Sequence, residues 1–209
     1  MVFDFHTHRK DAKNALISVS PAEFDPVEGL YYSVGIHPWN TEGVTEHDLE
    51  RLAAAAAHPQ VLAVGEAGFD KLRGGTHSVQ LSVMMRHIEL SEQLRKPLVI
   101  HCVKCIDDLL ALRRAFSPVQ PWIWHGFRGN ATMARTLLRQ GFYLSAGQYF
   151  NADAVAAVPA EKLLVETDDA SVRIESVARA VAACRRMSPV KLAEIVNANS
   201  YRLLQIRQE

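Results

Sequence analysis

The sequence contains few cysteines and no long hydrophobic segment. Three cysteines among 209 residues, an odd number, do not suggest a disulfide framework. No apolar run approaches the roughly 18 residues that a transmembrane helix requires. The first six residues also lack the basic start and the long apolar stretch of a signal peptide. We therefore expect a cytoplasmic protein that does not enter a membrane.

An excess of charge of either sign is also missing. The chain has 23 lysines and arginines against 23 aspartates and glutamates, and 48% of its residues are apolar, which is an ordinary globular balance. Proteins that bind long stretches of nucleic acid usually carry a basic excess, because neutralising phosphates supplies much of their affinity. Any anionic substrate must therefore be bound by local charges or by bound cations. No repeat or linker divides the chain, so we expect one domain over residues 1–209 and infer no obligate protein partner.

Short apolar segments alternate with longer helical patterns along the chain. The expected strands cover residues 2–6, 15–19, 31–36, 61–66, 98–101, 122–125, 142–146 and 163–166. The expected helices cover residues 45–57, 80–95, 106–116, 131–140, 174–187 and 190–202. This alternation favours an α/β fold, a (β/α)8 TIM-like barrel rather than an open sheet. The first two crossovers are short for a parallel connection, so we expect their helices to be shortened or missing.

Polar residues interrupt the expected strands at their C-terminal ends, the face on which barrel enzymes gather catalytic groups. His6 and His8 are two residues apart on an extended strand, so their side chains point the same way and can bind one metal ion. Four further strand-end residues extend this pair to six candidate metal ligands: Glu66, His101, His125 and Asp168. Nitrogen and oxygen ligands in this number suit two divalent ions of zinc, manganese or magnesium, with Glu66 as the natural bridging carboxylate.

Each of these residues also has a plainer interpretation. A single histidine at a strand end is more often a hydrogen-bonded residue than a metal ligand. We interpret in the plainer way the four histidines in or beside helices, which are His47, His58, His77 and His87. The six strand-end residues together would form a costly cluster of buried polar groups without a metal. The segment from Cys102 to Cys105 has the spacing of a redox motif or of half a zinc site, but without a second pair we interpret it as two small residues at a turn.

Several short segments carry most of these residues. In chain order they are Asp4-Phe5-His6-Thr7-His8, Gly35-Ile36-His37-Pro38, Gly65-Glu66-Ala67-Gly68-Phe69-Asp70, His125-Gly126-Phe127-Arg128-Gly129, Ser145-Ala146-Gly147 and Glu166-Thr167-Asp168. They resemble the D-x-H-x-H, G-x-H-P, G-E-x-G-L-D, H-C-F-S-G, S-x-G and E-T-D motifs of the TatD family of metal-dependent hydrolases. The helix that begins at Gln80 and the Asn199 near the end of the chain also match that family.

The resemblance implies a barrel that binds two divalent cations and hydrolyses phosphodiesters, and several family members are described as deoxyribonucleases. It implies the same six metal ligands, with Asp168 as the candidate general base and Glu66 as the second catalytic residue. Three residues near the mouth of the barrel are expected to bind substrate: His37, Lys104 and Arg128. The alternative role for His37 is structural, namely holding the turn at Pro38. The sequence departs from the family after His101, where Lys104 is the only cation in place of an expected arginine, and after Asp168, where the following loop is short.

The expected function is therefore that of a divalent-metal-dependent hydrolase. We expect a phosphodiesterase or deoxyribonuclease that acts on DNA ends or short oligonucleotides through activation of water by two metal ions. A hydrolase of small amides or esters, of the amidohydrolase-like kind, is the first alternative, because related barrels use similar metal centres for those bonds. A barrel that binds metal without catalysis is the second.

Overall fold

The structure, a computed structural model, describes residues 1–207 and contains an eight-stranded sheet in the strand order β1 to β8. The strands are β1 Asp4–Thr7, β2 Ala15–Val19, β3 Tyr31–Val34, β4 Val61–Asp70, β5 Leu98–Val103, β6 Trp122–Trp124, β7 Tyr143–Ala146 and β8 Leu163–Val165. The pairs β1–β2, β3–β4, β4–β5, β6–β7 and β7–β8 are parallel. A bridge between Thr7 and Asp168 also joins the end of β1 to the chain that follows β8. The predicted (β/α)8 TIM-like barrel is confirmed.

Helices follow the strands from β3 onward. They are α1 Glu46–Ala56, α2 His77–Leu94, α3 Ile106–Phe116, α4 Ala131–Arg139, α5 Ala152–Ala157, α6 Ile174–Cys184 and α7 Pro189–Leu204, with 3₁₀ helices η1 Pro38–Asn40 and η2 Ala160–Lys162. Six of these helices were predicted from their periodicity. Helix α5 was not, because six residues are too short to show a helical repeat. None of the helices in the described part of the chain is long and apolar enough to cross a membrane.

The first two crossovers contain no helix, as the sequence predicts. Residues 8–14 and 20–30 form turns and irregular backbone, whereas the segment 15–19 is a strand with the predicted bounds. Strands β4 and β5 differ from the prediction, because they continue past Glu66 and His101 rather than ending there. The ladder between them extends to the pairs Phe69↔Cys102 and Asp70↔Val103. The two strands thus remain paired with each other beyond Glu66 and His101.

The chain divides into two compact units. One unit is Ser18–Trp122, and the other combines Met1–Ile17 with the chain from Ile123 onward. The single domain expected over residues 1–209 remains a prediction.

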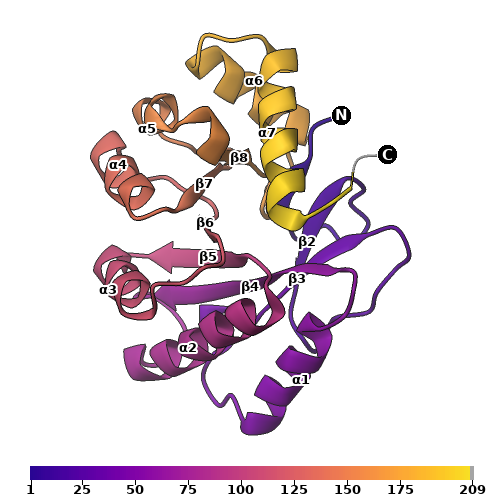
Figure 1. The fold of residues 1–209 in the computed structure, drawn as a ribbon, viewed down its shortest axis with the longest axis vertical. Coiled ribbons are helices and arrows are strands. Elements are labelled where there is room, and N and C mark those ends of the chain that lie inside the picture. The colour runs from indigo at the N-terminus through magenta and orange to yellow at the C-terminus, as the bar shows by residue number, and fades with distance from the viewer. Residues whose placement is uncertain (208–209) are drawn as a thin grey trace. The chain divides into compact units, whose positions relative to one another are not determined.

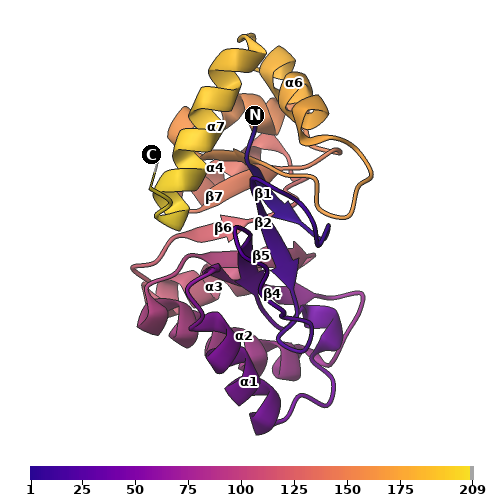
Figure 2. The same cartoon turned by 90° about the vertical axis from the view of Figure 1, so that its right-hand side faces the viewer.

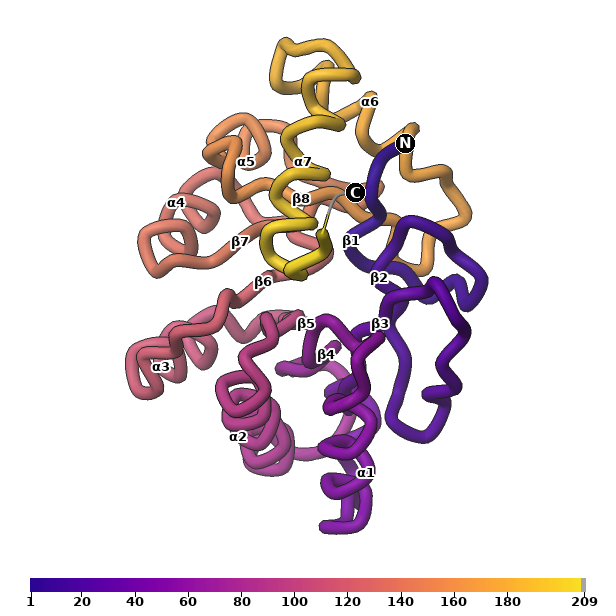
Figure 3. The backbone as a smooth tube through the Cα atoms, turned by 45° about the vertical axis from the view of Figure 1, so that its right-hand side comes forward, coloured from indigo at the N-terminus to yellow at the C-terminus, as the bar shows by residue number. Residues whose placement is uncertain are grey.

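In the unit Ser18–Trp122, α1 and α2 pack against strands β3, β4 and β5 (Figure 1). The core between them includes the fully buried side chains of Val64, Met84, Ile88 and Ile100. The tube in Figure 3 shows the irregular segment that precedes β3. Helix α1 begins with a capping box, in which Thr45 and Asp48 exchange hydrogen bonds with each other's backbone.

In the other unit, α7 packs against β8 and α6, and α4 packs against β7. Figure 2 shows the N-terminal segment beside α7, where the backbone N–H of Phe3 donates to Oδ1 of Asn197 at 2.8 Å. The amide of Asn199 donates to the carbonyls of Ala160 at 2.7 Å and Leu163 at 2.8 Å. The asparagine that matches the family therefore holds the start of β8, which leads directly to Glu166-Thr167-Asp168.

Candidate metal centre

In the unit formed by Met1–Ile17 and the chain from Ile123 onward, four predicted ligands converge. Asp168 Oδ1 lies 3.4 Å from Nε2 of His8 and 3.8 Å from Nε2 of His6. The ring of His6 also lies beside that of His125, with centroids 4.1 Å apart. His6 is fully buried and the His125 side chain is 6% exposed, whereas His8 and Asp168 are partly open to solvent. This unit therefore brings together four of the six predicted ligands. Solvent reaches the group at His8 and Asp168.

The backbone fixes Asp168 relative to β1. Its N–H donates to the carbonyl of His6 at 2.9 Å, and its carbonyl accepts from the N–H of His8 at 3.2 Å. Asp168 adopts a left-handed conformation with φ of 55°, which aspartate tolerates better than most residues. The chain turns at this residue, so that its carboxylate meets the two histidines of β1.

Asp4, the first residue of the D-x-H-x-H segment, stabilises this arrangement by binding Thr167. Its carboxylate accepts from the backbone N–H of Thr167 at 2.9 Å and from the Thr167 hydroxyl at 2.6 Å. Burial raises the pKa of Asp4 to about 6, against the opposing effect of these hydrogen bonds. Arg9 lies 3.6 Å from the same carboxylate and donates to Thr167, so its charge is engaged within the protein. Asp4 therefore fixes Thr167 between Glu166 and Asp168.

Glu166 belongs to this group although the sequence did not single it out. It is fully buried, and its Oε1 accepts from the N–H of Gly126 at 2.5 Å and lies 3.3 Å from Nδ1 of His125. Its Oε2 is buried and has no hydrogen-bond partner among residues 1–207. The signal was present in the E-T-D segment, but a glutamate directly after a buried strand also fits a structural role.

In the unit Ser18–Trp122, the other two predicted ligands meet directly. Nδ1 of His101 lies 2.8 Å from Oε1 of Glu66. His37, predicted to bind substrate, also joins them, with its Nε2 3.0 Å from the same oxygen and 3.3 Å from Nδ1 of His101. Its own Nδ1 accepts from the N–H of Trp39 at 3.1 Å. His37 therefore holds the Pro38 turn and also contacts the predicted ligands.

The glycine before Glu66 is required by close packing of the backbone. Gly65 has φ of 115°, and a Cβ added there would collide with the carbonyl oxygen of Val99 on β5. A larger residue would push β4 away from β5, and with it Glu66 from His101. The G-E pair of the motif thus combines a predicted ligand, Glu66, with the glycine that allows β4 to approach β5 closely.

Asp70 is a second acidic residue that sequence reasoning did not place in the site. Its Oδ2 accepts from Nε1 of Trp39 at 2.6 Å and lies 3.4 Å from Nε2 of His101. Burial opposes ionisation, but the hydrogen bonds from Trp39, the Leu72 N–H and His101 outweigh it and lower the pKa of Asp70. The carboxylate therefore fixes the ring of His101 from the side opposite Glu66.

The other two predicted substrate-binding residues are Arg128 and Lys104. The guanidinium of Arg128 lies over the ring of Tyr149, 5.3 Å from its centroid, in a part of the chain that also contains Asp168. Lys104 follows β5 in a left-handed conformation with φ of 57°. Neither position tests a contact with substrate, so both assignments remain predictions.

The cysteine pair before α3 requires a correction. Cys102 and Cys105 form a disulfide, with Cα atoms 5.8 Å apart, so the interpretation as two small residues at a turn is wrong. The turn after β5 brings the two residues within the usual range for such a bond. Cys184 is a free cysteine.

For His87, the structure agrees with the plainer interpretation of a hydrogen-bonded residue. It is fully buried on α2, where its Nε2 accepts from the N–H of Ile36 at 2.9 Å and its Nδ1 lies 2.8 Å from the carbonyl of Val83. Burial lowers its pKa to about 4, from about 6.5. The neutral imidazole thus fixes the chain just before His37.

Stability should fall at acid pH because of His87. Below about pH 6.5 the unfolded chain binds a proton on this residue that the folded protein excludes until about pH 4. The free energy of unfolding should therefore decrease by about 2 kcal/mol between pH 7.5 and 5 through this group alone. Urea denaturation of wild type and His87→Gln at both pH values measures the difference. His47→Gln, at an exposed histidine, is the control and should lose as much free energy of unfolding between the two pH values as wild type. An equal loss in wild type and His87→Gln would show that His87 is not the group responsible.

The chemistry of the donor groups fits divalent cations. Ligand atoms within 4.8 Å of one another are offered within the units by three sets of residues: His6 with His8 and Asp168, His125 with Glu166 and Asp168, and His37 with Glu66 and His101. Imidazole nitrogens mixed with carboxylate oxygens suit zinc and manganese. Buried groups in this density are costly unless they are compensated, and the buried Oε2 of Glu166 has no hydrogen bond in the described chain. The groups therefore support the use of divalent metal.

Comparison with known proteins agrees with this chemistry. A family model described as TatD related DNase matches residues 22–205. The chain is 34% identical over 171 residues to an uncharacterized metal-dependent hydrolase TatD of Mycobacterium tuberculosis, an alignment that covers 76% of this chain and 64% of that protein. The chain thus spans less than two thirds of that relative's length. It is 28% identical over 157 residues to a 3'-5' ssDNA/RNA exonuclease TatD of Cronobacter sakazakii, covering 68% of this chain and 57% of that protein.

Among solved structures, the TatD homolog YJJV of Escherichia coli K12 superposes with a TM-score of 0.83 at 19% sequence identity. The match covers 99% of this chain and 98% of that one. At this identity the likeness supports the fold, a (β/α)8 barrel.

Proposed function

This chain belongs to the family of TatD related DNases, which are metal-dependent hydrolases, and from that premise we propose that it hydrolyses phosphodiester bonds at DNA ends or in short oligonucleotides. The observation that carries the proposal is the convergence of His6, His8 and Asp168 in a chain that matches the family over residues 22–205. The nuclease activity named for the Cronobacter relative supports phosphodiesters as the substrate class.

We propose six metal ligands, four in one unit and two in the other: His6, His8, His125 and Asp168 with Glu66 and His101. Two divalent cations held there, zinc, manganese or magnesium, would lower the pKa of a water molecule and stabilise the oxygens of the substrate and leaving group. The predicted role of Glu66 as a ligand shared by both cations belongs to this proposal.

The residues of the chain have distinct proposed roles. Asp168 is partly exposed beside His8, so its carboxylate can reach a water molecule and accept its proton. His37 contacts Glu66 and His101 through its Nε2, and a hydrogen bond from this nitrogen to a substrate oxygen would replace one of those contacts. Arg128 and Lys104 are proposed to bind phosphate oxygens.

A hydrolase of small amides or esters is the competing function, because the metal chemistry is shared. Both functions can be tested with the purified protein and added manganese or zinc. We expect cleavage of short labelled oligonucleotides, loss of that cleavage with EDTA, and its return when metal is restored. Turnover of amides or esters with intact oligonucleotides would favour the competitor. Bound metal without either activity would favour a barrel that does not catalyse. The cytoplasmic location and the absence of an obligate protein partner also stay proposals.

A further inference from the structure

An exposed tryptophan lies beside the Glu66 group. Trp39 on η1 is 45% exposed, although its Nε1 donates to the buried carboxylate of Asp70 at 2.6 Å. Its ring packs in T-shaped arrangements with the rings of His37 and His101, whose centroids lie 4.7 Å and 6.0 Å away. A large aromatic surface is thus open to solvent within contact of the residues proposed to act on the substrate.

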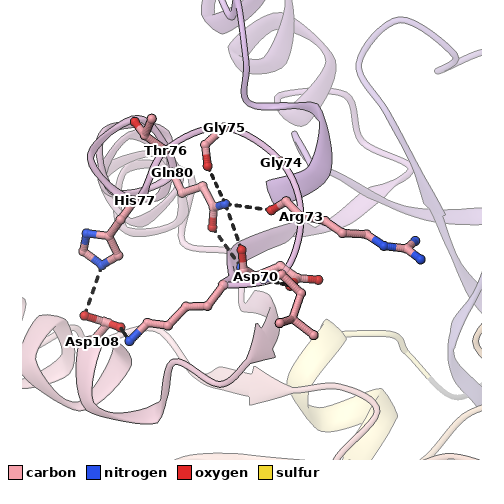
Figure 4. Close-up of a pocket in the computed structure, with 10 residues that line it drawn as sticks. Asp70, Arg73, Gly74, Gly75, Thr76, His77, Gln80 and Asp108 are labelled. Carbon is pink, nitrogen blue, oxygen red and sulfur yellow. Dashed lines mark hydrogen bonds and ion pairs between the residues drawn. The ribbon is translucent and has the colours of Figure 1, made fainter.

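A basic side chain accompanies this ring. The guanidinium carbon of Arg73 lies 4.6 Å from the centroid of the Trp39 ring. Arg73 is exposed and makes no ion pair with a carboxylate of residues 1–207. In Figure 4 its side chain extends away from His77 and Asp108, which line a cleft of about 700 Å³ beside it.

Lys71, another basic residue of that cleft, is paired, unlike Arg73. Nζ of Lys71 lies 2.9 Å from Oδ2 of Asp108, and Nε2 of His77 lies 3.1 Å from Oδ1 of the same residue. Arg73 also lines the cleft, and its guanidinium lies over Trp39 with no carboxylate partner among residues 1–207.

The loop that carries Arg73 is fixed relative to Trp39. The amide of Gln80 donates to the carbonyls of Asp70 at 3.0 Å, Arg73 at 3.0 Å and Gly75 at 2.9 Å (Figure 4). Gly74 has φ of 88°, and a Cβ there would collide with the carbonyl oxygen of Pro38, the residue before Trp39. The ring and the guanidinium are thus positioned in advance, which lowers the entropic cost of binding a ligand.

We propose that Trp39 and Arg73 bind the nucleotide next to the bond that is cleaved, with its base stacked on the face of the indole ring that Arg73 does not cover and its phosphate on the guanidinium. The inference rests on the proposed nuclease function and names the part of the substrate that this site recognises. An aromatic ring with an adjacent cation is the usual means of binding single-stranded nucleic acid, and it tolerates any base because every base has a π-face. The site would therefore select for the presence of a base and not for its identity.

Fluorescence tests this contact without turnover. Trp122 is fully buried and Trp124 is 7% exposed, so Trp39 is the tryptophan that a stacked base can quench. The probe is a phosphorothioate tetrathymidylate added to the protein with its metal, and the comparison is an abasic tetramer of equal charge. We expect quenching by the first and not by the second, and none in Trp39→Phe. Equal signals from both probes, or no signal, would overturn the proposal.

Steady-state kinetics distinguish base stacking on Trp39 from an indirect effect of Trp39 through its hydrogen bond to Asp70. For oligonucleotides with bases, Trp39→Ala should raise KM about tenfold or more with kcat within about threefold, and Trp39→Phe should recover most of the loss. Neither variant should change KM for an abasic oligonucleotide. Arg73→Ala should raise KM by a smaller factor, and Arg114→Ala, an exposed arginine of α3, is the matched control. A fall in kcat on both substrates would instead mean that Trp39 acts by holding Asp70 and His101, and would contradict stacking.

The nuclease function and the stacking site are tested by different outcomes. If wild type cleaves no phosphodiester, the nuclease proposal is wrong, and base-dependent quenching alone decides whether Trp39 binds a base. If wild type cleaves oligonucleotides with and without bases at equal KM, the nuclease proposal stands and the stacking site is wrong.

Discussion

Replacing Asp168 with alanine is expected to lower kcat on oligonucleotides by about a thousandfold or more, while the protein stays folded. The carboxylate lies 3.4 Å from His8 and 3.8 Å from His6, so the change removes a proposed ligand and the proposed proton acceptor together. The side chain is partly exposed, and the backbone hydrogen bonds of residue 168 to His6 and His8 do not depend on it. Steady-state kinetics with a circular dichroism spectrum of each variant measures both effects.

The exposed neighbour Asp169 provides the control, because Asp169→Ala removes the same charge one residue along the chain. It should keep activity close to wild type. An Asp168→Ala protein that retained more than a tenth of the wild-type kcat would remove Asp168 from the general-base role.

Glu66→Gln should reduce kcat by a similar factor and should also weaken metal binding. The substitution keeps the volume of a buried side chain, but its amide cannot replace the carboxylate that meets both His101 at 2.8 Å and His37 at 3.0 Å. A glutamine also carries no charge to offset a cation, so metal content after dialysis should drop along with turnover. Elemental analysis and kinetics on the same preparation test the two effects together.

Glu89→Gln on α2 is the matched control, since its side chain is 54% exposed and distant in sequence from the predicted ligands. It should behave as wild type in both measurements. Normal metal content in Glu66→Gln would mean that Glu66 is not a ligand, even if activity were lost.

Much of the site follows from the sequence because parallel strands end on one face. The period of a strand places His6 and His8 on one side, and the E-T-D segment after β8 brings Asp168 to them. Gly65, which precedes Glu66 in its motif, lies where β4 and β5 approach closely. These relationships are local or depend only on strand order.

The residues that were missed depend on contacts between segments far apart in the chain. Asp70 reaches His101 because β4 continues four residues beyond Glu66, which its polar side chains did not indicate. Glu166 joins His125 through a turn at Gly126. The Cys102–Cys105 disulfide is instead a local contact between residues three apart, and it was missed because two cysteines at this spacing have several uses.

We propose that the chain holds a pair of divalent cations. Titration of the purified, metal-stripped protein with manganese, with bound metal counted after removal of the free ion, measures their number. We expect two ions per chain, with fewer in Glu66→Gln and Asp168→Ala and an unchanged number in Glu89→Gln. One bound ion per chain, or none, at saturating manganese would contradict the proposal.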